Sequence, residues 1–110
     1  ALPKQPILKM QLASHYFASK QYEPMQATLD DILKLRKDEK SLEMARMLVG
    51  EFYFKIRDFE RALKQFEEGA KEQADKKHDY QKRIVETYIY MNKKTDAVRL
   101  VEEILKENPK

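Results

Sequence analysis

Apolar side chains recur along the chain at the three- and four-residue spacing of an α-helix. The clearest stripe consists of Phe59, Ala62, Leu63, Phe66 and Ala70, which this spacing places on one helix face. Similar stripes occur within 25–33 and within 97–105. Asp58 directly precedes the clearest stripe, and its carboxylate is suited to accept a free backbone N–H as an N-cap. The pattern predicts an amphipathic helix in each of these three stretches.

Three further helices are predicted over approximately 6–20, 41–56 and 79–91, which makes three pairs. The chain has only two glycines, and helix-forming residues are abundant. The fold class is therefore all-α. The middle helix is apolar on nearly all sides, so we expect it to be buried on most of them. Its apolar members are Leu42, Met44, Ala45, Met47, Leu48, Val49, Phe52, Tyr53, Phe54 and Ile56.

A tyrosine marks the first helix of each pair. These tyrosines, Tyr16, Tyr53 and Tyr88, are separated by 37 and 35 residues. Three residues before each tyrosine stand Ala13, Gly50 and Val85. Nine residues after stand Met25, Ala62 and Ala97, and thirteen residues after stand Leu29, Phe66 and Val101. A self-match at a period near 35 is typical of stacked helical hairpins. Small residues let the two helices of a hairpin approach closely, and large residues fill the space between hairpins.

This pattern resembles the tetratricopeptide repeat (TPR) family, whose unit has 34 residues. The second repeat, 43–76, matches best, through Val49, Gly50, Tyr53, Phe59, Ala62 and Phe66. The third, 78–110, matches through Ile84, Tyr88, Ala97, Val101 and Pro109, and the first, 6–39, through Leu12, Ala13, Tyr16, Tyr22 and Leu29. The resemblance implies a single domain of three hairpins in a right-handed solenoid, with residues 1–5 as an N-terminal arm.

The chain also departs from the family pattern. No repeat has tryptophan at its fourth position, where Lys9, Arg46 and Gln81 stand. The spacings above 34 predict longer turns at 37–41 and 76–78. Pentatricopeptide repeats have similar hairpins and read RNA bases. The intermixed charges and the small and aromatic residues of the second repeat favour the protein-binding family instead.

Acidic and basic residues are nearly balanced, 19 against 22, and they are intermixed in every repeat. A nucleic-acid binder usually gathers Lys and Arg on one face, so we expect no nucleic-acid partner. The chain has no cysteine and no apolar run long enough for a membrane span. We therefore expect no disulfide and no membrane insertion. The composition is that of a soluble domain, for which the cytoplasm is the default location, and a secreted or lipid-anchored parent protein is the alternative.

No constellation of residues suited to catalysis or metal binding is evident. The two histidines, His15 and His78, are too far apart in sequence to share a helix face. Adjacent acids such as Asp30 and Asp31 point about 100° apart on a helix, so they do not form a dyad that shares a proton. We expect no enzymatic activity, no cofactor and no metal.

In the TPR family the first helix of each hairpin lines a concave surface, and the resemblance implies which residues face it. They are Ile7, Met10, Ser14, Phe17 and Ala18, then Met44, Met47, Glu51, Phe54 and Lys55, then Asp79, Lys82, Glu86, Ile89 and Tyr90. Much of this surface is apolar, with three methionines, which suits varied apolar partners. We expect an apolar peptide or helix to bind there, with Lys55, Lys82, Arg83 and Glu86 setting its orientation. The alternative is that these residues only pack against one another.

Some TPR domains grip a chaperone's C-terminal carboxylate with converging Lys, Arg and Asn side chains. The corresponding positions here hold Met10, Ser14, Leu48, Asp79 and Arg83. Because only Arg83 supplies a suitable donor, we expect no such clamp.

The last predicted helix has more apolar surface than its own hairpin needs, since Val98 adds to the stripe of Leu100, Val101, Ile104 and Leu105. Terminal repeats usually need a polar cap. We therefore expect either a fragment of a longer repeat protein or pairing with another copy, through a stacking face of Val98, Val101 and Leu105. The alternative function is accordingly a structural spacer or self-association segment with no ligand of its own.

Overall fold

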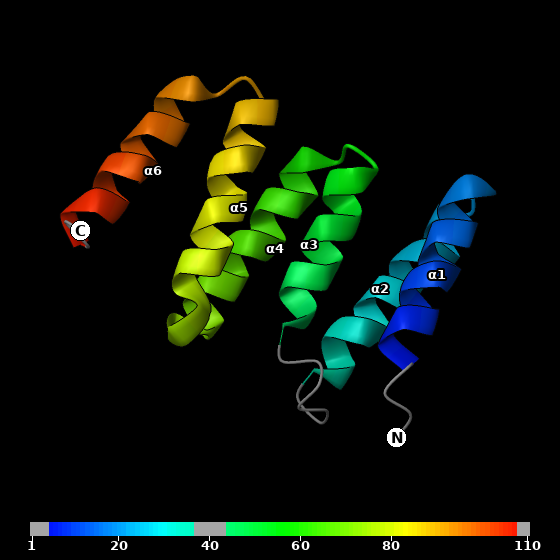
Figure 1. The fold of residues 1–110 in the computed structure, drawn as a ribbon. Helices are drawn as coiled ribbons and strands as arrows, with labels where there is room; N and C mark the ends of the chain where they lie inside the picture. Colours follow the sequence, from blue (N-terminus) through cyan, green and yellow to red (C-terminus); the bar gives the residue numbers. More distant parts are fainter. Residues whose placement is uncertain (1–4, 37–43, 108–110) are drawn as a thin grey trace. The chain divides into compact units, whose positions relative to one another are not determined.

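The computed structural model describes residues 5–36 and 44–107 (Figure 1). These residues form α1 (Gln5–Ala18), α2 (Tyr22–Leu35), α3 (Ala45–Lys55), α4 (Phe59–Glu72), α5 (Lys77–Tyr90) and α6 (Lys94–Glu107). A short 3-10 helix, η2 (Ala74–Lys76), lies between α4 and α5. The predicted all-α class is confirmed. In the described part of the chain, no helix combines the length and apolar character that crossing a membrane requires.

The chain divides into two compact units, Ala1–Val49 and Gly50–Lys110. In the first unit α1 packs against α2, and in the second α4 packs against α5 and α5 against α6. The main packing partners of each helix are thus its neighbours in sequence. This arrangement is consistent with stacked hairpins.

The three turns inside the hairpins share one backbone conformation. Lys20, Arg57 and Asn92 have φ angles of 60°, 65° and 61°, in the left-handed region. The next residue of each turn donates its N–H to the carbonyl oxygen of the repeated tyrosine, at 2.8 Å: Gln21 to Tyr16, Asp58 to Tyr53, and Lys93 to Tyr88. This is the hydrogen bond of a Schellman C-cap. The left-handed residue ends each first helix one or two residues before the predicted ends at 20, 56 and 91.

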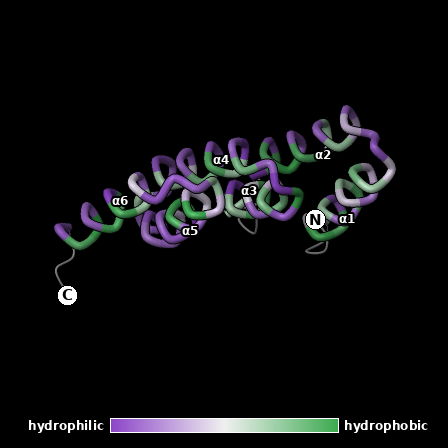
Figure 2. Tube along the Cα trace, turned by 90° about the horizontal axis from the view of Figure 1, so that it is seen from above, coloured by the Kyte–Doolittle hydropathy of each residue, from purple (hydrophilic) through white to green (hydrophobic). Residues whose placement is uncertain are grey.

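The buried positions follow the predicted apolar stripes. Met25, Leu29 and Ile32 of α2 are buried, as are Ala62 and Phe66 of α4. The tube in Figure 2 alternates between hydrophobic and hydrophilic colours along α6, as expected of an amphipathic helix. In α3, the buried residues are Ala45, Val49, Phe52 and Tyr53, and no apolar side chain of the described helix is fully exposed. The expectation that this helix is buried on most sides is confirmed, although Leu42 lies outside the described residues.

Both glycines lie where two helices approach closely. A Cβ atom on Gly50 of α3 would overlap the ring of Phe66 in α4. Likewise, a Cβ atom on Gly69 of α4 would overlap the ring of Tyr80 in α5. The predicted role of Gly50 as a small packing residue is confirmed. Gly69 plays the same role at the next interface, between two hairpins.

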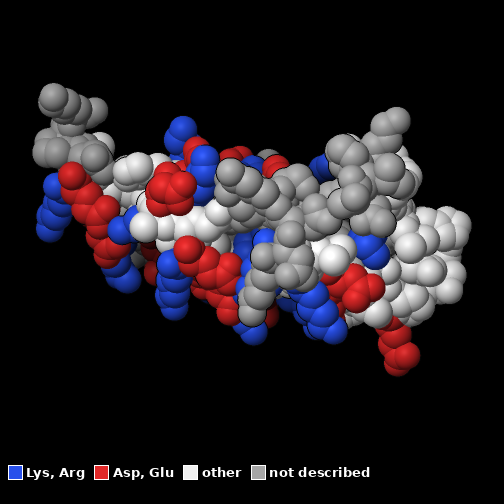
Figure 3. Space-filling view, turned by 90° about the horizontal axis from the view of Figure 1, so that it is seen from below, with Lys and Arg blue, Asp and Glu red and all other residues white. Residues whose placement is uncertain are grey.

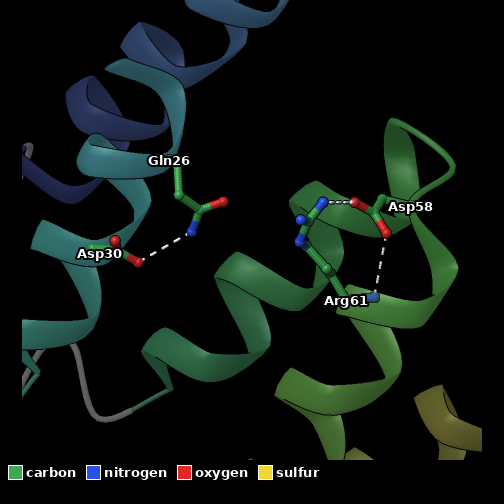
Figure 4. A network of polar contacts seen from close by, with 4 residues as sticks. All are labelled: Gln26, Asp30, Asp58 and Arg61. Carbon is green, nitrogen blue, oxygen red and sulfur yellow. Dashed lines mark hydrogen bonds and ion pairs between the residues drawn. The ribbon is translucent and has the colours of Figure 1, made fainter. Parts of the chain in front are cut away.

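Asp58 caps α4 as predicted (Figure 4). Its Oδ1 accepts a hydrogen bond from the backbone N–H of Arg61 at 3.3 Å, and its Oδ2 pairs with the Arg61 guanidinium at 2.7 Å. The hydrogen bond that the Arg61 guanidinium donates to Asp58, together with the negative charge of Asp58, raises the pKa of Arg61 above its ordinary value. The side chain of Arg61 is exposed, so the cap contributes to stability mainly through the backbone hydrogen bond.

The connection between α4 and α5 differs from the prediction. Residues expected to form a longer turn at 76–78 instead complete η2 and begin α5 at Lys77, two residues before the predicted start at 79. The hydroxyl of Tyr80 donates to Oε1 of Gln73 at 3.1 Å, which ties this connection to the first turn of α5. The other predicted long turn, at 37–41, lies outside the described residues.

Candidate functional site

Three aromatic rings from successive helices of the second unit meet in one cluster. Phe54 of α3 lies 5.2 Å from Phe59 of α4 and 4.9 Å from Tyr90 of α5, measured between ring centroids. Phe59 and Tyr90 lie 5.7 Å apart. Phe54 meets both neighbours edge to face, a favourable geometry for ring quadrupoles. We call Phe54, Phe59 and Tyr90 the aromatic cluster.

Arg83 of α5 lies next to this cluster and packs on two rings. Its guanidinium carbon lies 4.9 Å from the centroid of Phe54 and 5.4 Å from that of Phe66. Contacts of this kind are worth about 0.5–2 kcal/mol, depending on how far the cation is desolvated. Nε of Arg83 is buried and has no hydrogen-bond partner among the described residues. The flat guanidinium therefore acts as a planar packing group.

Two carboxylates balance the charge of Arg83. Its Nη1 lies 3.0 Å from Oε1 of Glu86, and its Nη2 lies 3.8 Å from Oε2 of Glu51. One cation beside two carboxylates leaves one negative charge at the edge of the aromatic cluster. Both carboxylates are about half exposed, so they retain lone pairs that can accept hydrogen bonds from a partner.

The rings and charges form a surface that is only partly buried. Tyr90 is 56% exposed, whereas Phe54 and Phe59 are half-buried beneath it. Such an arrangement provides an apolar contact area, fixed from below by α3 and α4, with polar groups at its edge. Small sets of polar groups beside a largely apolar surface are typical of recognition sites.

Several of the predicted groove residues come together here. Glu51, Phe54, Arg83, Glu86 and Tyr90 form one connected set of contacts. Lys55 and Lys82, their neighbours in sequence, are exposed. In the first unit, the predicted groove residues Met10, Phe17, Met44 and Met47 are half-buried. Phe17 lies 6.0 Å from Tyr22 between ring centroids.

One residue expected to face the groove lines a different surface. Ile89 lies in a hollow between α5 and α6, although its neighbour Tyr90 belongs to the aromatic cluster. Adjacent residues of a helix point about 100° apart, so the two side chains face different sides of α5. Sequence analysis treated Phe59 and Phe66 as stripe and repeat residues and did not include them among the site residues. One feature of the sequence could have indicated that Phe59 contacts Phe54. Phe59 directly follows the cap residue Asp58, where a side chain can reach back across the turn to the preceding helix.

The hollow between α5 and α6 has a volume of about 430 Å³. Its apolar lining comes from Val85 and Ile89 of α5 and from Ala97, Val98 and Val101 of α6. Of the predicted stacking face, Val98, Val101 and Leu105 are all exposed, at 57%, 38% and 56%. The predicted stacking face is thus an open apolar surface in this structure.

The side chains considered for catalysis and metal binding lie on the surface of their own units. His15 and His78 are exposed, and Nδ1 of His78 lies 3.1 Å from Oε1 of Gln81. Asp30 accepts a hydrogen bond from Gln26 at 3.1 Å (Figure 4). Its neighbour Asp31 is exposed. Residues 5–36 and 44–107 contain no group of three or more histidine or acidic side chains placed to hold a metal ion.

The pKa of Tyr88 in α5 is also shifted. Burial raises the pKa of its phenol above the ordinary value, and the nearby charge of Glu67 raises it further. A phenol whose pKa lies above its usual value stays neutral throughout the physiological range. Tyr88 therefore does not act as a base at neutral pH.

Charged side chains are intermixed on the surface. On the face shown in Figure 3, Lys and Arg alternate with Asp and Glu across the described residues, without a region of one sign. Several of these charges pair locally, as Arg99 does with Asp96 at 3.6 Å. No protein-family model matches this sequence, and no curated protein and no solved structure matches it either.

Proposed function

We propose that this chain is a TPR-like interaction module, without enzymatic activity, that binds a protein segment carrying apolar side chains. The shared turn conformation at a spacing of 37 and 35 residues supports three equivalent hairpins and hence a TPR-like solenoid. The observation that carries the binding proposal is the convergence of Phe54, Arg83 and Tyr90 in one half-exposed surface.

Binding would combine apolar contact with polar orientation. An apolar side chain of the partner packs on Tyr90 and Phe54, which are held by Phe59 and Arg83. Partly buried aromatic residues supply large contact areas with little side-chain entropy to lose. Glu51 and Glu86 accept hydrogen bonds from backbone N–H groups or a basic side chain of the partner. This chemistry favours an apolar peptide or helix with donors along one edge.

The TPR resemblance adds expected contact residues on the first helices, outside the aromatic cluster. It assigns Met10, Phe17, Met44 and Met47 as apolar contact residues, and Lys55 and Lys82 as polar ones. The half-burial of the four apolar residues leaves part of each available for contact. This extension is tested separately, by replacing Met47 with Glu.

A peptide-library selection on the 110-residue chain tests the proposal. The selection is run in parallel on Tyr90→Glu and on Ile89→Glu, which alter adjacent residues of similar exposure on different sides of α5. We expect wild type and Ile89→Glu to enrich related apolar peptides. Tyr90→Glu should bind those peptides at least about tenfold more weakly, since a carboxylate beside Glu86 must be desolvated.

Two results would contradict this function. If folded wild-type protein enriches no peptide, the spacer or self-association alternative is favoured. If Ile89→Glu loses the peptides as fully as Tyr90→Glu, the binding surface is not the aromatic cluster. Circular dichroism of each variant separates loss of binding from loss of fold.

A further inference from the structure

The first helix exposes apolar side chains at positions that are buried in the other hairpins. Leu8 and Leu12 of α1 are 56% and 43% exposed. The tyrosine spacing gives their counterparts as Ala45 and Val49 in α3 and Tyr80 and Ile84 in α5, all of which are buried. The same face of a first helix is therefore covered in two hairpins and open in the first one.

The last helix shows the complementary difference. Val101 of α6 is 38% exposed, whereas its counterpart Phe66 in α4 is fully buried. Val98 and Leu105 are also exposed, while their counterparts Leu63 and Ala70 in α4 are half-buried. This face is thus covered on α4 and open on α6, where it adjoins the hollow of about 430 Å³.

The interface between α4 and α5 shows how these two kinds of face fit together. Tyr80 of α5 lies against Gly69 of α4, and Arg83 of α5 lies over the ring of Phe66. A first helix of one hairpin therefore covers the second helix of the hairpin before it. The chain presents both halves of this interface uncovered, one on α1 and the other on α6.

We propose that the chain associates head to tail, with α1 of one copy packing on the α5–α6 face of a second copy. Leu8 and Leu12 would take the places that Tyr80 and Ile84 occupy on α4, and they would close the hollow beside Val98 and Val101. The occupant is a second copy because only a first helix of this repeat reproduces the existing α4–α5 packing. The surface is separate from the aromatic cluster, so the association is independent of the proposed peptide binding.

The charges on the two faces are compatible with this contact. The sequence of α1 contains no acidic residue, and Lys9 lies next to Leu8. One acid and one base, Glu102 and Lys94, line the hollow, so its charged lining is balanced and Glu102 is available to pair with Lys9. Since the two faces differ, the contact is heterologous, and it produces chains or rings of copies rather than a closed two-fold dimer.

Sedimentation measurements on the 110-residue chain test this association. The concentration series extends to about 1 mM, because a small interface is expected to be weak. We expect the average mass to rise beyond twice the monomer mass of 13.2 kDa. Leu8→Lys and Val98→Lys each remove one face, so each variant alone should stay monomeric. Ala27→Lys, at an exposed residue of α2, is the matched control and should associate like wild type.

Mixing the two variants gives the decisive measurement. Leu8→Lys retains the α6 face and Val98→Lys retains the α1 face, so the equimolar mixture should form a one-to-one dimer and nothing larger. The proposal is overturned if wild type stays monomeric throughout the series. It is also overturned if either variant still associates by itself, since two like faces would then be pairing. Both altered residues are exposed, and circular dichroism checks that each variant remains helical.

Discussion

Helices α4 and α6 occupy equivalent places in two successive hairpins, yet they differ in how much of their apolar stripe is covered. In α4 the stripe is covered at Ala62, Phe66 and Gly69, whereas the only fully buried residue of α6 is Ala97. In both helices a buried alanine stands at the same repeat position, Ala62 in α4 and Ala97 in α6. The difference arises because α5 packs on the outer face of α4, while the outer face of α6 stays exposed. The same periodic pattern of apolar residues is therefore buried in the core in α4 and partly exposed on the surface in α6.

The largest expected effect comes from removing the equivalent side chains of the two helices. Phe66→Ala should lower the free energy of unfolding by about 3–4 kcal/mol, because it deletes a fully buried ring and leaves a cavity. Val101→Ala should cost no more than about 0.5 kcal/mol, because its side chain is already partly hydrated. Urea denaturation followed by circular dichroism, at a concentration too low for association, measures both. Equal losses would mean that the outer face of α6 is covered in solution.

A second expectation concerns the close approach of α4 and α5. Alanine favours a helix interior over glycine by about 1 kcal/mol. Gly69→Ala should nevertheless lower the free energy of unfolding by about 1–2 kcal/mol, because the added Cβ overlaps the ring of Tyr80. The same substitution in a Tyr80→Val background should instead be stabilising, since the ring is gone. A stabilising effect of Gly69→Ala in the native background would show that the two helices are not this close.

The starts of α4 and α6 provide a third comparison, at the level of caps. Asp58 caps α4, whereas the equivalent position before α6 holds Lys93, a poor N-cap. Asp58→Ala should cost about 1 kcal/mol, and Lys93→Asp should contribute about 0.5–1 kcal/mol. Thermal unfolding of the two variants measures the expected loss and the expected gain in stability. Asp58→Asn, which keeps a capping oxygen, is the control. A destabilising Lys93→Asp would mean that the lysine has a role beyond the cap.

The helices could be predicted well from the sequence because the apolar period, the cap and the tyrosine spacing all indicate the same helix positions. The six helices, the cap at Asp58 and the packing role of Gly50 are confirmed. Helix ends were less accurate, since they depend on left-handed residues at Lys20, Arg57 and Asn92. Only asparagine among these has a side chain that commonly marks that conformation.

The candidate site was harder to predict than the fold. Family positions named Glu51, Phe54 and Tyr90, which contact Arg83 or one another in the structure, but they gave no information on how Arg83 packs. Its place over Phe54 and Phe66 depends on the contact of α5 with both α3 and α4, which no local pattern encodes. Ile89 lines the hollow between α5 and α6, which the family position did not predict, because position within a repeat does not determine which neighbour a borderline residue contacts.

The smallest expected effect separates the two turns of the second unit. Arg57 before α4 and Asn92 before α6 have nearly the same left-handed φ, 65° and 61°. A side chain such as arginine is strained there, whereas asparagine tolerates this conformation and glycine adopts it freely. Arg57→Gly should therefore raise the free energy of unfolding by about 0.5–1 kcal/mol, and Asn92→Gly should change it by only a few tenths. Arg57→Ala removes the side chain but keeps the Cβ, so it should give none of the gain. If the alanine variant is as stable as the glycine variant, the arginine side chain and not the backbone conformation is the source of the strain.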